Sequence, residues 1–210
     1  MKLTQSILLL MAAVLTACAT PTNNVRFYSL ADASLIKSKV ESQSSAPPIN
    51  IEVLPINVPE RLKRPQLVIT SKNSAQIQIL EQDRWSSSFN DELQDAFASG
   101  LSQQLNAIDI SRGGRVVQQP VYRIAIVLQQ FSATPGDEVM ANFGWAITEL
   151  NNTARSNPIP SVTCQTTISK TVGNGTNAVV KGLQEAVAEA TQAIATNVKN
   201  LKNGEVGKCN

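Results

Sequence analysis

The 210-residue chain contains no histidine. This absence excludes Ser-His-Asp and Cys-His nucleophile systems, and also every metal site that needs an imidazole ligand. An excess of one charge is also missing, because 18 basic residues nearly balance 16 acidic ones. The chain therefore lacks the basic surface typical of proteins that bind nucleic acid. Its glycine-containing segments at 113–114 and 173–175 lack the lysine and the spacing of a phosphate-binding loop.

Carboxylates are the remaining candidates for catalysis, and they occur in two clusters, one with Asp91, Glu92 and Asp95 and the other with Asp137 and Glu138. Paired carboxylates supply the acid and base of glycosidases. The first cluster falls on the polar face of an expected helix and the second falls in a turn, where carboxylates are ordinarily solvated. We therefore expect no enzyme activity, no metal and no cofactor.

The N-terminus has the pattern of a bacterial lipoprotein signal. Lys2 is followed by an apolar stretch that ends near Leu15, too early for a membrane-spanning helix of roughly 20 apolar residues. Leu15-Thr16-Ala17-Cys18 matches a lipobox. We predict that residues 1–17 are a cleaved signal peptide and that Cys18 carries S-diacylglycerol and an N-acyl chain. Ala19 is not the aspartate that resembles an inner-membrane retention signal in enteric bacteria, which favours the periplasmic face of the outer membrane.

The mature chain is expected to hold one domain. Residues 18–24 are small and polar and predict a lipidated flexible tether, and residues 25–210 are long enough for a single periplasmic domain. Cys164 and Cys209 remain as a pair in an oxidising compartment. A bridge between them closes a loop of about 45 residues and adds roughly 3 to 4 kcal/mol of stability; the alternative is that Cys164 is a buried free thiol.

Hydrophobic periodicity predicts an α+β fold. Strands are expected at 25–30, 49–56, 67–70 and 75–80, and longer ones at 121–131, 139–150 and 162–172. One amphipathic helix follows position 83 or 86–88, with an apolar residue every four positions from Phe89 to Leu105, and a second spans about 177–201. This order predicts a two-layer fold, in which a mainly antiparallel sheet carries both amphipathic helices on one face.

The segment from Pro59 to Pro65 places Arg61, Lys63 and Arg64 between two expected strands. We interpret it as an exposed basic turn. It is a candidate for contact with anionic lipid headgroups or with an acidic partner surface, where each cation adds about 1 kcal/mol. The alternative is a turn that only aids solubility.

Four segments together resemble the ABC-type transport auxiliary lipoproteins typified by PqiC (YmbA). Phe27-Tyr28-Ser29-Leu30 resembles the opening strand of that family, and the segment from Val53 to Leu62 resembles its next strand and turn. The segment from Arg64 to Val68 is similar to an "RPQIV" motif, and Asp83-Arg84-Trp85-Ser86 is similar to a tryptophan-led helix opening. The loop at 151–160 and the terminal Cys209 depart from the family pattern.

The resemblance implies a component of a lipid-trafficking system. Its expected partners are an MCE-domain protein that spans the periplasm, membrane lipid and, indirectly, an inner-membrane permease-like component; a homo-oligomer is left open. Trp85 becomes a candidate docking residue, since tryptophans dominate interfaces, although the ring can instead seal its helix against the sheet. The alternative function is a lipid- or lipoprotein-binding carrier with its own apolar cavity.

Overall fold

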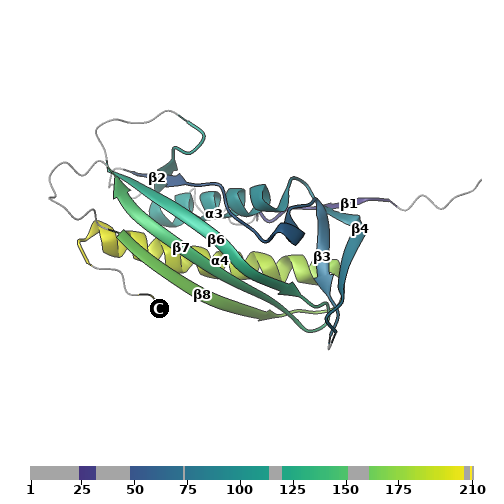
Figure 1. Cartoon of the computed structure of the whole chain (residues 1–210). Helices are drawn as coiled ribbons and strands as arrows, with labels where there is room; N and C mark the ends of the chain where they lie inside the picture. The colour runs from purple at the N-terminus through teal and green to yellow at the C-terminus, as the bar shows by residue number, and fades with distance from the viewer. Residues whose placement is uncertain are drawn as a thin grey trace, which may run out of the picture.

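The computed structural model describes residues 24–31, 48–72, 74–113, 120–150, 161–205 and 209. These residues form an α+β fold, which confirms the predicted class (Figure 1). In chain order the elements are β1 (Arg26–Tyr28), β2 (Ile49–Val53), the short 3-10 helix η1 (Glu60–Leu62), β3 (Gln66–Thr70), β4 (Ile77–Trp85), α3 (Phe89–Leu105), β5 (Ala107–Asp109), β6 (Val121–Ala133), β7 (Glu138–Leu150), β8 (Ser161–Thr171) and α4 (Thr176–Lys202).

The strands divide into two mixed sheets instead of the single sheet predicted, while most of the strand pairing is antiparallel, as predicted. The larger sheet has the order β5-β2-β6-β7-β8, and the smaller has the order β1-β4-β3. The predicted antiparallel meander β6-β7-β8 and the β3–β4 hairpin are present. However, β2 pairs in parallel with both β5 and β6, and β1 pairs in parallel with β4. Long connections, two of them containing α3, separate these strands and permit parallel pairing.

The first long helix, α3, begins at Phe89 after Ser88, one of the predicted cap positions, whereas the helix opening that the family resemblance implied at 83–86 is wrong. Ser88 has an extended backbone at the N-cap position, and Asn106 ends the helix in the left-handed conformation with φ of 49°, as asparagine tolerates. The segment at 83–86, expected to open the helix, instead belongs to or directly follows β4. The predicted apolar stripe is buried, as its four-residue spacing requires: Phe89, Leu93, Phe97 and Leu101.

Both helices cover the same face of the five-stranded sheet (Figure 1). The longer one, α4, packs against β7 and β8, and α3 packs against α4, β2 and β5. Gly182 lets α4 approach the sheet closely, because a Cβ there would lie 2.3 Å from a methyl group of Val172. The two layers that the sequence predicted are therefore present, with the helices as one layer.

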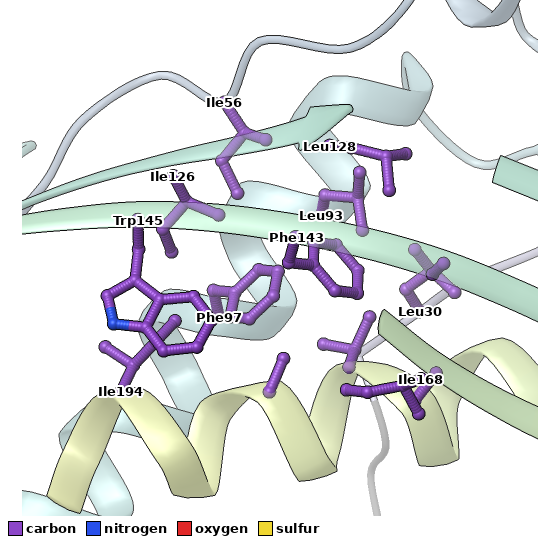
Figure 2. Packing of buried hydrophobic residues seen from close by; sticks show 14 of the residues in the cluster. Leu30, Ile56, Leu93, Phe97, Ile126, Leu128, Phe143, Trp145, Ile168 and Ile194 are labelled. Atoms are coloured by element: carbon purple, nitrogen blue, oxygen red, sulfur yellow. The ribbon is translucent and has the colours of Figure 1, made fainter. Parts of the chain in front are cut away.

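The core lies between the helices and the sheet (Figure 2). The rings of Phe97 on α3 and Phe143 on β7 meet edge to face with centroids 5.3 Å apart, an arrangement that aromatic pairs favour. Trp145 on β7 and Ile194 on α4 extend the same cluster and are buried. The smaller sheet lies at one end of the molecule, where β3 and β4 are labelled in Figure 1.

Candidate functional site

The small sheet holds the first described strand, β1, and is therefore the part of the described fold closest in sequence to Cys18. Cys18 and most of the predicted tether lie outside the described residues. β1 is short and sits at an edge, where β4 is its one partner among the described strands. Three backbone pairings are a weak attachment for a strand, so side chains must contribute to holding it.

A buried carboxylate, Asp83 on β4, makes this attachment. Nε and Nη2 of Arg26 donate hydrogen bonds to its two oxygens at 2.7 and 2.8 Å, and the Tyr28 hydroxyl donates another at 3.0 Å. Oγ1 of Thr176, at the start of α4, donates to Oδ2 at 3.4 Å. Burial raises the pKa of the Asp83 carboxyl, but the hydrogen bonds and the charge of Arg26 outweigh it and lower the pKa below the ordinary value. The ionised carboxylate therefore clamps β1 to β4 and α4.

A second carboxylate, Glu92 on α3, holds the residues that follow β1. The Leu30 backbone N–H donates to its Oε2 at 2.9 Å. Ser87 donates to Oε1 from its backbone N–H at 3.1 Å and from its hydroxyl at 2.9 Å, and the Ser86 hydroxyl donates to the same oxygen. Burial raises the pKa of the Glu92 carboxyl, but these donors outweigh burial and lower it. Glu92 thus joins the β1 segment to the start of α3.

The burial of Glu92 corrects the expectation that its carboxylate cluster is solvated. Glu92 is only 5% exposed, whereas Asp91 and Asp95 are exposed as predicted. The reason is its place on the helix, three residues after the buried Phe89 and therefore on the same side. The serines at 86 and 87 were the available signal, since they supply hydroxyl donors near one carboxylate.

The predicted basic turn forms η1 and its flanks. Leu62 is buried and fixes the turn to the core. Arg61 is exposed and donates from Nη2 to the Phe131 carbonyl oxygen at 3.2 Å. Lys63 is exposed and pairs with Glu60 at 2.8 Å, while Arg64 is half-buried, with no partner for its buried Nε among the described residues. The turn therefore presents two of its three cations directly before β3.

Trp85 does not fit the role of a docking residue. It is the last residue of β4 and only 5% exposed. Its ring stacks on that of Phe89 with centroids 5.2 Å apart, and its backbone N–H donates to the Pro65 carbonyl oxygen. The packing role fits better, with the correction that Trp85 seals the end of a strand rather than the first turn of a helix.

Exposed apolar side chains at this end of the molecule were not singled out from the sequence. Val25, Phe27, Ile77 and Ile79 are all exposed, and Phe27 has the largest exposed fraction, 67%. Phe27 lies between Arg26 and Tyr28, which both bond to Asp83. Because neighbouring residues of a strand point to opposite faces, Phe27 must point outward. The alternation of residues 25–30 contained this signal, but the buried face was not assigned.

The described residues also contain a groove between α3 and α4, with a volume of about 500 Å³. Its lining combines apolar residues with exposed charged ones: Leu30, Ala96, Val187, Ala188, Lys181 and Glu185. It is open to solvent, because Lys181, Glu185 and Ala188 in its lining are exposed. The described residues between the helices and the sheet, in contrast, form a packed hydrophobic core.

The structure pairs Cys164 of β8 with Cys209 in a disulfide, with their Cα atoms 5.4 Å apart. β8 is an edge strand of the larger sheet. The bridge therefore holds the C-terminal end of the chain beside an exposed sheet edge. It lies on a different sheet from the clamps on β1.

Two further findings limit the chemistry of the described part of the chain. No group of three or more His, Cys, Asp or Glu side chains there is arranged to hold a metal ion. None of the helices with described residues combines the length and the apolar character needed to cross a bilayer.

Comparisons with known proteins add a family and a fold. The model of a family described as "ABC-type transport auxiliary lipoprotein component" matches residues 28–195. A crystal structure titled only as an uncharacterized protein has a TM-score of 0.61 at 16% identity, covering 83% of this chain and 99% of its own. The structure of protein XCC0632 from Xanthomonas campestris has a TM-score of 0.51 at 13% identity, covering 76% and 91%. Among curated proteins, none matches the sequence. At these identities the solved structures show a shared fold alone.

Proposed function

This chain belongs to the family of ABC-type transport auxiliary lipoprotein components, and we propose that it is the outer-membrane lipoprotein of an envelope lipid-transport system. In this role it docks a periplasm-spanning MCE-domain protein to the outer membrane and supports envelope integrity. An inner-membrane permease-like component is an indirect partner. The observation that carries the proposal is the family match, which runs from β1 through most of α4. We propose no catalytic role for the domain.

The lipobox supports the anchoring part of this proposal. A single acyl chain binds a bilayer only marginally, at about 0.8 kcal/mol per buried CH₂, but a triacylated cysteine buries several chains. The tether at 18–24 leads directly to β1, and the clamps at Asp83 and Glu92 join that strand to the whole domain. A pull on the lipid is thereby passed to the folded domain.

Fractionation of the envelope tests the anchor. The Cys18→Ala variant should leave the membrane fraction and lose function, whereas Cys164→Ser, which leaves the lipobox intact, should stay membrane-bound. In an enteric host, Ala19→Asp should move the protein from outer-membrane to inner-membrane fractions. A Cys18→Ala protein that still floats with membranes would contradict lipid anchoring.

Crosslinking tests the partner. Gentle crosslinking of intact envelopes followed by mass spectrometry should recover an MCE-domain protein with the wild-type lipoprotein. The Cys18→Ala variant, produced at the same level, should recover much less, because the domain is no longer held at the membrane. Recovery of no MCE-domain protein from wild-type envelopes would remove the docking function and favour the carrier described next.

A lipid- or lipoprotein-binding carrier is the second candidate, and the groove between α3 and α4 is the observation that favours it. Its volume of about 500 Å³ lies in the range of small-molecule sites, roughly 300–1,000 Å³. A carrier should purify with about one bound lipid per chain by native mass spectrometry. Ala188→Trp, which fills the groove, should abolish that lipid, and Gln192→Trp on the exposed side of α4 should retain it. Lipid-free wild-type protein would contradict a carrier.

A further inference from the structure

Exposed apolar side chains are concentrated in one part of the fold. Five large hydrophobic residues are exposed in the described part of the chain, and four of them lie on or next to β1 and β4: Val25, Phe27, Ile77 and Ile79. The fifth, Ile108, lies on β5 at an edge of the other sheet. Single exposed hydrophobic residues are ordinary. Several in one small sheet indicate a contact surface.

The small sheet and β5 lie at opposite ends of the molecule. Figure 1 shows β1, β3 and β4 at one end, and β2, the strand beside β5, at the other. The small sheet is thus a distinct end face, and Ile108 is a natural comparison site far from it.

The length of chain before β1 identifies what this end face meets. Six residues, from Ala19 to Asn24, separate Cys18 from Val25. Fully extended, this segment reaches at most about 25 Å. A lipid on Cys18 therefore keeps Val25 within about 25 Å of the bilayer surface, and the small sheet that contains β1 is the end of the fold nearest the tether, whereas β5 lies at the other end.

The polar neighbours of these side chains suit a lipid surface. Phe27 is in register with Arg84 on β4, so an apolar ring and a cation lie side by side, matching the acyl region and the anionic headgroups of a bilayer. The segment 74–80, which contains Ile77 and Ile79, carries no charged residue. Contact with lipid here requires no burial of a charge.

We propose that the small sheet is a second membrane contact, in which Val25, Phe27, Ile77 and Ile79 rest in the headgroup region beside the lipidated Cys18. The domain then lies with this end on the bilayer and its long axis directed into the periplasm, instead of turning freely on its tether. This inference rests on the proposed function, because it requires the lipid anchor.

Site-specific fluorescence on the full mature lipoprotein tests the orientation. An environment-sensitive dye is attached to Phe27→Cys, Ile79→Cys or Ile108→Cys, and each protein is reconstituted into phosphatidylethanolamine–phosphatidylglycerol vesicles. The parent protein must take up no dye, which shows that Cys164 and Cys209 are blocked. Quenching by aqueous iodide is compared with quenching by brominated phospholipid, and flotation measures membrane attachment separately.

The expected result is a blue shift and quenching by brominated lipid at positions 27 and 79, with quenching by iodide at position 108. Equal iodide quenching at all three positions in protein that floats would overturn the inference and leave the anchor intact. Protection from both quenchers at positions 27 and 79 would show that a protein surface, such as a second copy of this chain, covers the sheet, and would also overturn it. Protein that does not float with the vesicles would contradict the lipid anchor, and therefore also the proposed orientation.

Discussion

The indole Nε1 of Trp145 lies 2.9 Å from Oδ1 of Asn197 and donates a hydrogen bond to it. Both residues are buried. The bond joins β7 in the middle of the larger sheet to α4. A buried polar pair of this kind fixes the helix at one position on the sheet, because any slide of α4 along β7 leaves the indole N–H without its acceptor.

Asn197→Ala should therefore destabilise the domain by about 1–3 kcal/mol, the cost of leaving a buried donor unpaired. Gln192→Ala, on the exposed side of the same helix, should change stability by less than about 0.5 kcal/mol. Urea denaturation followed by tryptophan fluorescence measures both. Equal stabilities of the two variants would contradict this role for Asn197.

Acid should weaken the attachment of β1. The pKa values of Asp83 and Glu92 are lowered in the folded protein, so both carboxyls stabilise the fold above the unfolded value of about 4, and this stabilisation is lost as the pH falls through the lowered values. The double variant Asp83→Asn, Glu92→Gln should be less stable at pH 7 and should lose less stability on acidification. Denaturation midpoints between pH 7 and pH 2.5 test this.

The matched control for that series is Asp95→Asn, because Asp95 is exposed and pairs only at the surface with Arg112. It should follow the wild-type pH dependence closely. A double variant whose stability falls with acid as steeply as that of the wild type would show that the two clamps do not carry the effect.

Loss of the disulfide should destabilise the fold, because the unfolded chain gains conformational entropy when the bridge no longer closes the loop. The bridge spans 45 residues, and the chain-entropy relation gives about 4 kcal/mol for a loop of that size. Cys164→Ser, Cys209→Ser and the double variant should lose similar amounts. Denaturation with and without reductant, together with intact-mass measurement, provides the test; a wild-type mass that shows two free thiols would refute the bridge.

Because α4 approaches Val172 closely at Gly182, replacing this helical glycine with alanine should destabilise the fold. Alanine normally favours a helix over glycine by about 1 kcal/mol, but a Cβ at position 182 would lie 2.3 Å from Val172. Gly182→Ala should therefore destabilise by about 1–3 kcal/mol through overpacking. Adding Val172→Ala should recover part of the loss, whereas Gly113→Ala, where a Cβ meets nothing within 4 Å, should be neutral. A stabilising Gly182→Ala would contradict the clash.

Charge reversal tests the basic turn. Arg61 and Lys63 are exposed, so Arg61→Glu with Lys63→Glu should leave the fold stable to within about 1 kcal/mol and reduce crosslinking to the partner or contact with anionic vesicles. Lys199→Glu, on the exposed side of α4, should leave both unchanged. Quantitative crosslinking and vesicle flotation in low and high salt measure the effect. Unchanged crosslinking and flotation yields would show that the basic turn serves solubility alone.

Local patterns predicted the elements whose signal lies within one segment. The four-residue spacing from Phe89 to Leu101 marked α3, and the turn between residues 70 and 77 marked the β3–β4 hairpin. Both patterns arise from the residue repeat of a single helix or strand, so they can be recognised without knowing which other element packs against it. The meander of β6, β7 and β8 was predictable for the same reason.

The errors came from pairings between distant segments. The division into two sheets depends on β1 meeting β4 and on β2 meeting β5 and β6, which residue alternation does not encode. The family resemblance of the segment 83–86 implies a helix opening at Trp85, but this residue ends a strand and stacks on Phe89. Glu92 is expected in solvent because it shares a cluster with the exposed Asp91 and Asp95, and the donor from Leu30 that helps bury it is far away in the sequence. Exposure of Phe27 follows only once Asp83 is known to occupy the other face of the strand.

The clamp on β1 has a mechanical consequence. If Cys18 is held in the membrane while a partner pulls on the rest of the domain, the load enters the fold at Arg26. The strand cannot peel away there one residue at a time, because Arg26 and Tyr28 grip Asp83 while Leu30 grips Glu92. These bonds therefore share the tension between β1 and the elements that carry the two carboxylates, β4 and α3.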